Sequence, residues 1–115
     1  PRFIVAVDEE RMLLGCGQIK THRDGSRELA SIAVEVSRRK QGIASAIIAH
    51  LLAETTMPVF LTCREKLGSF YENFGFKIAD WAQMTSYFRI LRILVNILQA
   101  VHTMPGKMLV MIKTA

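Results

Sequence analysis

Short apolar runs separated by polar turns occupy the N-terminal part of the chain, which is the pattern of β-strands. These runs cover residues 3–7, 12–19 and 28–36. A polar segment at residues 8–11 separates the first two runs, and Asp24-Gly25 is a strong turn signal before the third. Gly15 and Gly17 inside the second run indicate a bulge or a close backbone contact. The pattern therefore predicts three antiparallel strands.

The period changes to that of a helix in the middle of the chain. Two adjacent i, i+4 rows form the buried face of this helix, namely Ile43, Ile47 and Leu51, and beside them Ala44, Ile48 and Leu52. Pro58 ends the helix, and the apolar run at 59–62 predicts a buried strand parallel to the third strand. A second helix is predicted over 67–74, closed by Gly75, before a strand at 76–81.

Residues 84–102 predict a third helix that is apolar over most of its circumference. Its polar seam consists of Arg89, Arg92, Asn96 and Gln99. Such a helix must be covered on more than one side, so we predict that it forms part of the core and of a homodimer interface. A helix lying on a membrane is the less favoured alternative. Pro105-Gly106 ends the helix, and 107–113 predicts a final strand.

These elements predict a mixed α/β fold in one domain, residues 1–115. Composition agrees, because 50% hydrophobic and 22% charged residues exclude disordered and fibrous classes. A net charge of +5 favours an anionic partner, which charge alone leaves as a phosphorylated cofactor, nucleic acid or a membrane surface. No dense basic run is interleaved with aromatic residues, so nucleic acid is not expected.

The two cysteines, Cys16 and Cys63, lie in apolar runs with no Cys or His at metal-ligand spacing. We therefore expect buried free thiols and no metal site, as in a protein of the reducing cytoplasm. The sequence shows no secretory signal pattern and no uninterrupted apolar run of membrane-spanning length.

The segment Arg38-Arg39-Lys40-Gln41-Gly42-Ile43-Ala44 joins a predicted strand to a predicted helix. The N-terminus of a helix presents unpaired backbone N–H groups and the positive end of its dipole, so it suits a phosphate group. Gly42 allows a ligand to approach the backbone closely. Cations at a helix N-terminus oppose the dipole, and this placement is explained if an anion normally binds there.

Two motifs give the sequence a resemblance to the GNAT superfamily of acetyl-CoA-dependent N-acetyltransferases. Arg39, Gly42 and Ala44 match the Arg/Gln-x-x-Gly-x-Gly/Ala motif of that family between a strand and a helix. Residues 70–76, Phe-Tyr-Glu-Asn-Phe-Gly-Phe, match its second motif at the end of the next helix. Either motif alone is weak, but both in order, about thirty residues apart, are specific.

The resemblance implies acetyl-CoA as cosubstrate and a GNAT-like fold. In this family the strand before the first motif splays away from the next parallel strand, and the pantetheine arm pairs with its free edge. Val34 and Val36 would offer backbone N–H groups there, with Val34 near the thioester carbonyl. Backbone groups of residues 39–44 would hold the pyrophosphate, namely Arg39, Lys40, Gln41, Gly42, Ile43 and Ala44.

The resemblance also implies direct attack of an amine, from a small molecule or a peptide, on the acetyl group. Tyr71 falls on the position of the family's general acid, and Glu28 on a general base that some members carry. Read without the family, Tyr71 is a packed tyrosine and Glu28 a solvated charge at a strand start. His22, His50 and His102 have no partner at meaningful spacing, so surface or satisfied histidines are expected.

The sequence departs from the family pattern in three places. Val36 stands where members usually have Pro, and an aromatic residue near Arg38 is missing. The chain also starts at the family's second strand, without the first strand and two helices that wall the acceptor site. We expect residues 84–102 to fill that space, to dock on another subunit, or both. A CoA-binding or oligomeric module without catalysis and a peripheral membrane protein are the competing hypotheses.

Overall fold

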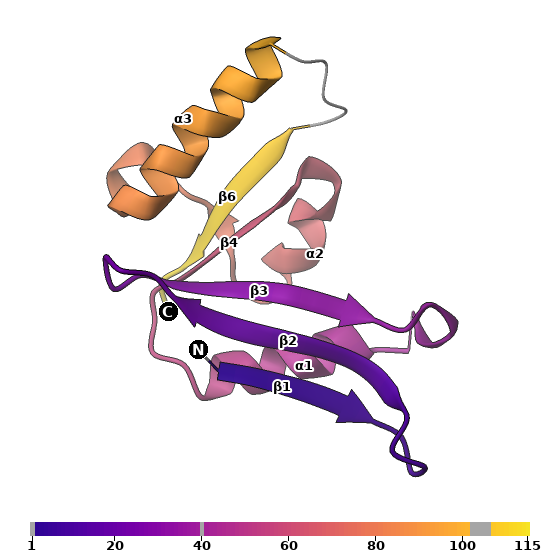
Figure 1. Cartoon of the computed structure of the whole chain (residues 1–115). Coiled ribbons are helices and arrows are strands. Elements are labelled where there is room, and N and C mark those ends of the chain that lie inside the picture. The colour runs from indigo at the N-terminus through magenta and orange to yellow at the C-terminus, as the bar shows by residue number, and fades with distance from the viewer. Residues whose placement is uncertain (1, 40, 102–106) are drawn as a thin grey trace.

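Six strands form one mixed sheet in the order β1-β2-β3-β4-β6-β5 in the computed structural model, which describes residues 2–39, 41–101 and 107–115 (Figure 1). The strands are β1 (Arg2–Val7), β2 (Leu13–Thr21), β3 (Arg27–Val34), β4 (Val59–Arg64), β5 (Lys77–Ile78) and β6 (Met108–Lys113). The helices are α1 (Ile43–Ala53), α2 (Gly68–Glu72) and α3 (Ser86–Val101), with short 3-10 turns at Val36–Arg38, Glu65–Leu67 and Trp81–Gln83. Lys40, His102 and Pro105-Gly106 lie outside the described residues.

The predicted mixed α/β fold is confirmed, with β1, β2 and β3 antiparallel and β4 parallel to β3. The third strand is shorter than predicted, because it ends at Val34 and Val36 begins a 3-10 turn. The carboxylate of Glu35 ends the strand by accepting hydrogen bonds from the backbone N–H and the hydroxyl of Ser37, at 3.3 and 3.4 Å.

Two elements after β4 also differ in length from the prediction. The second helix, α2, is limited to Gly68–Glu72 because a 3-10 turn supplies the residues before it, and Gly75 follows with a positive φ of 92°. The strand expected over 76–81 pairs only at Lys77–Ile78. A capping box between Asp80 and Gln83 starts a 3-10 turn at Trp81 and ends the extended segment.

The parallel strands β3 and β4 pair at one position among the described residues, Glu28 with Phe60. Beyond that pair the two strands diverge in the direction of their C-terminal ends, as Figure 1 shows. On their other edges the two strands are paired along their length, β3 with β2 and β4 with β6. The facing edges of β3 and β4 therefore bound a V-shaped opening in the sheet.

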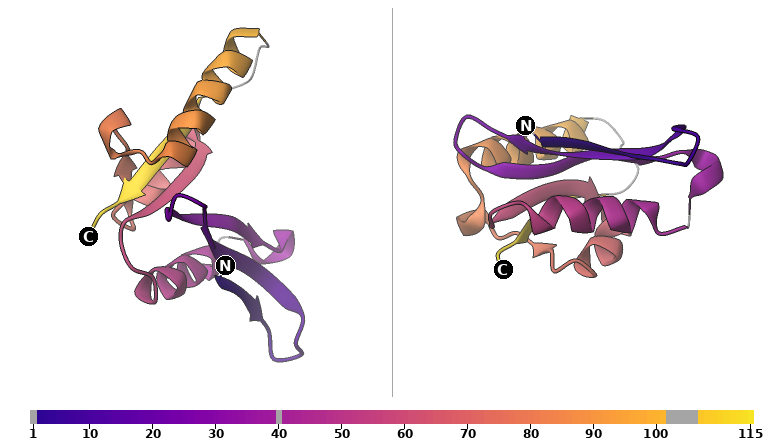
Figure 2. Two further views of the ribbon diagram at one scale, coloured as in Figure 1. Left: turned by 60° about the vertical axis from the view of Figure 1, so that its left-hand side comes forward. Right: turned by 90° about the horizontal axis from the view of Figure 1, so that it is seen from below.

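Helices lie on both faces of the sheet (Figure 2), and a separate apolar cluster lies on each face. On one face α1 and α2 pack on a large cluster that includes Leu29, Ile48, Leu51, Leu61, Phe76 and Met111. On the other face α3 packs on a smaller cluster formed by Phe60, Ala79, Met84, Phe88, Val110 and Ile112. Phe88 is fully buried there and stacks on Phe60, with ring centroids 4.5 Å apart.

The outward face of α3 is apolar and exposed, as the sequence pattern predicts. The residues Ile90, Ile93, Leu94, Ile97 and Leu98 are between 48% and 58% exposed. Among the described residues, no helix has the length and apolar character needed to cross a membrane. The intramolecular core thus covers one side of α3 and leaves the other side open.

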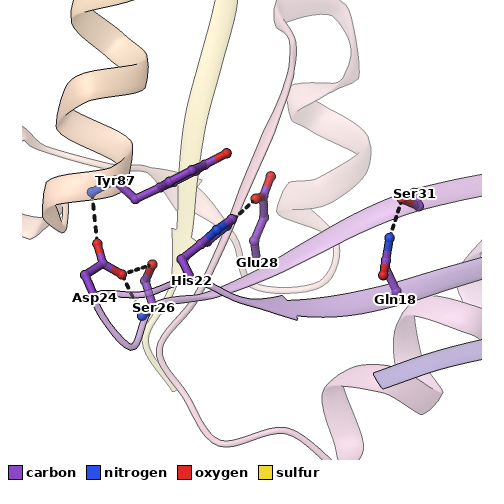
Figure 3. Close-up of polar contacts among 7 residues, drawn as sticks. All are labelled: Gln18, His22, Asp24, Ser26, Glu28, Ser31 and Tyr87. Carbon is purple, nitrogen blue, oxygen red and sulfur yellow. Dashed lines mark hydrogen bonds and ion pairs between the residues drawn. The ribbon is translucent and has the colours of Figure 1, made fainter. Parts of the chain in front are cut away.

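Asp24, in the turn between β2 and β3, holds this turn against the first turn of α3 (Figure 3). One carboxylate oxygen accepts hydrogen bonds from the backbone N–H and the hydroxyl of Ser26, at 2.9 and 2.6 Å. The other accepts from the backbone N–H of Tyr87 at 2.9 Å. The hydrogen bonds from Ser26 and Tyr87 lower the pKa of Asp24 well below its usual range.

The substitution Asp24→Ala should lower the free energy of unfolding by about 1 kcal/mol, because it removes the side-chain acceptor from an N–H in the first turn of a helix. The pKa of Asp24 is lower in the folded protein than its ordinary value of 3.8. The contribution of the Asp24 carboxylate to the free energy of unfolding is therefore complete above pH 3.8 and is lost as the pH falls below that value. Urea unfolding of both proteins at neutral and acidic pH measures the difference. Equal stability at neutral pH would contradict this role.

Candidate active site

A β-bulge in β3 faces the V-shaped opening, and the sequence analysis did not locate it. Ser31 and Ile32 both lie opposite Gly17, between the pairs Cys16–Ala33 and Gln18–Ala30. Ser31 has a positive φ of 57°, and its hydroxyl accepts a hydrogen bond of 2.7 Å from the side-chain amide of Gln18 (Figure 3). Such a bulge redirects the backbone groups of the strand.

The glycines of β2 carried an indirect signal of this bulge. A Cβ on Gly17 would lie 2.5 Å from Cδ1 of Ile32 and 2.8 Å from Cγ2 of Ile47. A Cβ on Gly15 would lie 2.7 Å from the backbone oxygen of Ala33 on β3, which confirms the predicted close backbone contact. The extra residue lies on β3, where neither Ser31 nor Ile32 identifies it in the sequence.

The loop before α1 has the geometry of an anion site. Gly42 precedes the helix with a positive φ of 78°, and a Cβ at this position would meet no atom within 4 Å. The first intrahelical bond runs from the N–H of Ala46 to the carbonyl of Gly42, at 3.0 Å. The first turn contains no acidic residue, and its earlier N–H groups point out of the helix end.

Arg39 links this loop to the end of β3, because its Nε donates a hydrogen bond of 3.3 Å to the carbonyl of Val34. The structure thus brings Val34, Arg39 and the start of α1 together, as expected for adjoining parts of one site. Val36 lies apart from the strand, 70% exposed in the 3-10 turn.

Tyr71, on α2, is half-buried against the larger apolar cluster. Its ring contacts Phe70 and Phe76, with centroids 5.2 and 6.2 Å away. Burial, and secondarily the nearby Cys63, raise the pKa of the Tyr71 hydroxyl above its usual range. The phenol is therefore protonated at neutral pH and able to donate a proton.

Glu28 lies at the vertex of the V-shaped opening, on the face of the sheet opposite α1. The residue is only 8% exposed, and Oε1 lies 2.7 Å from Nε2 of His22 (Figure 3). The negative charge of Glu28, after burial, contributes to raising the pKa of Tyr87 on α3. The interpretation of Glu28 as a solvated charge is therefore wrong.

His22 is a satisfied histidine, which is one of the two expected outcomes. The turn at Asp24-Gly25 folds this residue back toward β3, where Glu28 meets it. Its ring stacks on Tyr87 with centroids 3.6 Å apart and meets the edge of Phe88. Sequence spacing could not identify these partners, because Tyr87 and Phe88 come from a distant helix. His50, in contrast, is exposed and lies 3.9 Å from Glu54 on the same helix.

Glu28 and Tyr71 therefore lie on opposite faces of the sheet. Tyr71 packs with the cluster beneath α1 and α2, and Glu28 lies with His22 and Tyr87 on the side of α3. The described residues contain no group of three or more His, Cys, Asp or Glu that could hold a metal ion.

The sequence model of the acetyltransferase (GNAT) domain matches residues 1–78. The chain belongs to this family. The match confirms the resemblance inferred from the motifs around Gly42 and Tyr71. A search of curated protein sequences found no match.

Solved structures of GNAT proteins share the fold of this chain. N-acetylglutamate synthase from Neisseria gonorrhoeae, complexed with coenzyme A and N-acetyl-glutamate, has a TM-score of 0.72 at 17% identity over 98% of this chain. Rv2747 from Mycobacterium tuberculosis, in complex with CoA and NLQ, has a TM-score of 0.72 at 18% identity over 99% of this chain. A GNAT-family acetyltransferase from Staphylococcus aureus has a TM-score of 0.66 at 14% identity over 97% of it.

The alignments span different shares of these proteins. They cover 25% of the synthase, 76% of Rv2747 and 66% of the staphylococcal protein. This chain therefore corresponds to one domain of the larger synthase. The alignments with the synthase and with Rv2747 cover 98% and 99% of this chain, so they include α3.

Proposed function

We propose that the 115 residues act as one domain that binds acetyl-CoA and transfers its acetyl group to an amine by direct attack. The observation that carries this proposal is the pairing of β3 and β4 at Glu28–Phe60 alone among the described residues. The strands diverge from that pair, and the N-terminus of α1 follows the end of β3. An extended ligand with a phosphate group fits such an opening, because it finds free strand edges and helix N–H groups.

Acetyl-CoA supplies both features. Its pantetheine arm would pair with the free edge of β3 up to Val34, and its pyrophosphate would accept hydrogen bonds from the backbone around Gly42. The cofactor residues proposed are Val34, Val36, Arg39, Lys40, Gln41, Gly42, Ile43 and Ala44. Open space at Gly42 and the absence of acidic residues in the first turn of α1 support this placement.

The transfer needs a neutral amine, stabilisation of the oxyanion and a proton for the thiolate. Glu28 would accept a proton from the amine nitrogen, which then forms the C–N bond with the acetyl carbon. Backbone N–H groups on the free edge of β3, between the Ser31 bulge and Val34, would stabilise the negative charge on the carbonyl oxygen. The C–S bond then breaks, and Tyr71 would give its proton to the sulfur of CoA and recover a proton from solvent.

The proposed acceptor is a primary amine on a small molecule or peptide. The appropriate screen is a panel that includes amino acids, polyamines and peptide N-termini. Amino acids are included because one structural neighbour is an N-acetylglutamate synthase. Two free cysteines support a reducing compartment such as the cytoplasm.

Gly42→Ala should weaken acetyl-CoA binding, because the new methyl group enters the space proposed for the pyrophosphate. Gly25→Ala is the matched control, since Gly25 has a similar φ of 84° and equally open surroundings in the turn between β2 and β3. Both variants should lose about 1 kcal/mol of stability from left-handed strain. Only Gly42→Ala should reduce the rise in melting temperature produced by acetyl-CoA. A wild-type protein with no rise at saturating acetyl-CoA would contradict cofactor binding.

Glu28→Gln and Tyr71→Phe should each lower kcat by about a hundredfold or more, because each removes a proton-transferring group. Release of CoA thiol with each amine of the panel measures the rate, and Glu10→Gln on an exposed turn is the control. Unchanged rates in both variants would remove the assigned roles. A wild-type protein that binds acetyl-CoA but acetylates no amine would favour the CoA-binding module.

We also propose that a second copy of the chain covers the exposed face of α3 and forms a homodimer. Leu94→Glu should then give a monomer in sedimentation, because a charge enters the apolar contact. Met12→Glu is the control, because Met12 is also exposed, at 62%, but lies between β1 and β2 and not on α3. This variant should remain a dimer. A monomeric wild type would exclude the homodimer, and co-sedimentation with liposomes would then favour membrane association.

A further inference from the structure

A cluster beside the proposed base includes a histidine to which the proposed reaction gives no role. Nε2 of His22 lies 2.7 Å from Oε1 of Glu28, and the two side chains are only 15% and 11% exposed. A hydrogen bond from this N–H to Oε1 fixes the carboxylate and leaves Oε2 for the amine proton. The position of the base therefore depends on the position of one imidazole ring.

Helix α3 fixes that imidazole ring through two contacts. The ring of Tyr87 stacks on His22 with an interplanar angle of 13°, while Phe88 contacts the edge of the imidazole 5.7 Å away. Asp24 binds the N–H of Tyr87 and thereby holds the turn that carries His22 against the same helix. His22 is thus enclosed between Glu28 and the first turn of α3.

We propose that His22 is a positioning residue for Glu28, held in place by α3. This inference rests on the proposed acetyl transfer, and it gives α3 a part in catalysis besides its packing. His22 donates to Oε1 and stabilises the ionised carboxylate. The amine proton passes to Oε2 of Glu28 as the C–N bond forms, and it leaves the carboxyl group to solvent after each turnover.

Other charged groups surround the pair and stay present in the test variants. Lys20 lies opposite Glu28 on β2, and Arg23 and Asp24 lie in the adjoining turn. Tyr87 faces the pair from α3, and β4 contributes the apolar Phe60 at the register position of Glu28. The outer side of the cluster is a pocket of about 380 Å³ lined by His22, Arg23, Asp24, Ser86 and Tyr87. A small molecule from solvent therefore reaches the place of the imidazole ring.

His22→Ala should lower kcat about ten- to a hundredfold, the loss equivalent to one hydrogen bond to a charged group. The KM for acetyl-CoA should not change, because His22 lies away from the proposed cofactor loop. His22→Gln, whose amide can donate to Glu28, should recover most of the rate, and free imidazole should partly rescue His22→Ala.

His50→Ala is the matched control, because His50 also lies beside a glutamate but on the exposed surface of α1. It should keep the wild-type kcat and pH profile. Tyr87→Ala removes the stacking partner and leaves the His22–Glu28 pair, so it should lower kcat with an unchanged response to acetyl-CoA. This variant decides the question if His22→Ala does not fold.

Three results would overturn the inference, and they are distinguishable. A wild-type protein that acetylates no amine removes the proposed transfer and this role with it. If the wild type is active and His22→Ala has the same kcat, the positioning role alone is removed. An equal loss in His22→Gln and His22→Ala, without rescue by imidazole, shows that the loss has a purely structural cause.

Discussion

The pairing of β3 with β4 at a single described position, Glu28 with Phe60, determines where every other part of the site lies. Two adjacent parallel strands normally satisfy their backbone groups along their whole length, and here they do so only at one end. Divergence leaves backbone donors and acceptors of β3 without a strand partner beyond the vertex. A ligand that can pair with an edge therefore has a defined place, and the end of this edge leads directly to the N-terminus of α1.

Apolar packing on both faces of the sheet holds β4 in place. The clusters under α1 and α2 and under α3 each include residues of β4, with Leu61 and Cys63 on one side and Phe60 on the other. β4 is thus held by β6 and by both layers of helices, while β3 is held by β2 and α1. The cluster under α1 and α2 also includes Ile19 of β2 and Leu29 of β3, so it joins the two halves of the sheet on that face. Tyr71 packs on this face, and Glu28 lies on the other.

Helix α3 connects the two halves on the side of Glu28. Its apolar inner face packs on β4 and β6 through Phe88, while the N–H of Tyr87 binds Asp24 of the hairpin formed by β2 and β3. A buried carboxylate is costly unless it has a hydrogen-bond partner, and His22 satisfies that requirement for Glu28. The surroundings of Glu28 are therefore assembled from β2, β3, β4 and α3, whose residues are far apart in the sequence.

The sequence alone predicted most elements and the glycine turn before α1, because these depend on local period and on residues with special backbone conformations. Gly42 and Gly75 have positive φ angles, which glycine adopts easily and which the local turns require. The apolar rows of α1 can be recognised in the sequence without knowledge of what they pack against. The limits of β3 and of α2 were missed, since Glu35 and the 3-10 turn at Glu65–Leu67 end or replace regular structure by side-chain and turn contacts. The bulge at Ser31 and the partners of His22 were decided only by the tertiary structure. The bulge depends on the register between β2 and β3, and the rings that stack on and pack against His22 come from α3, so neither follows from the spacing of residues along the chain.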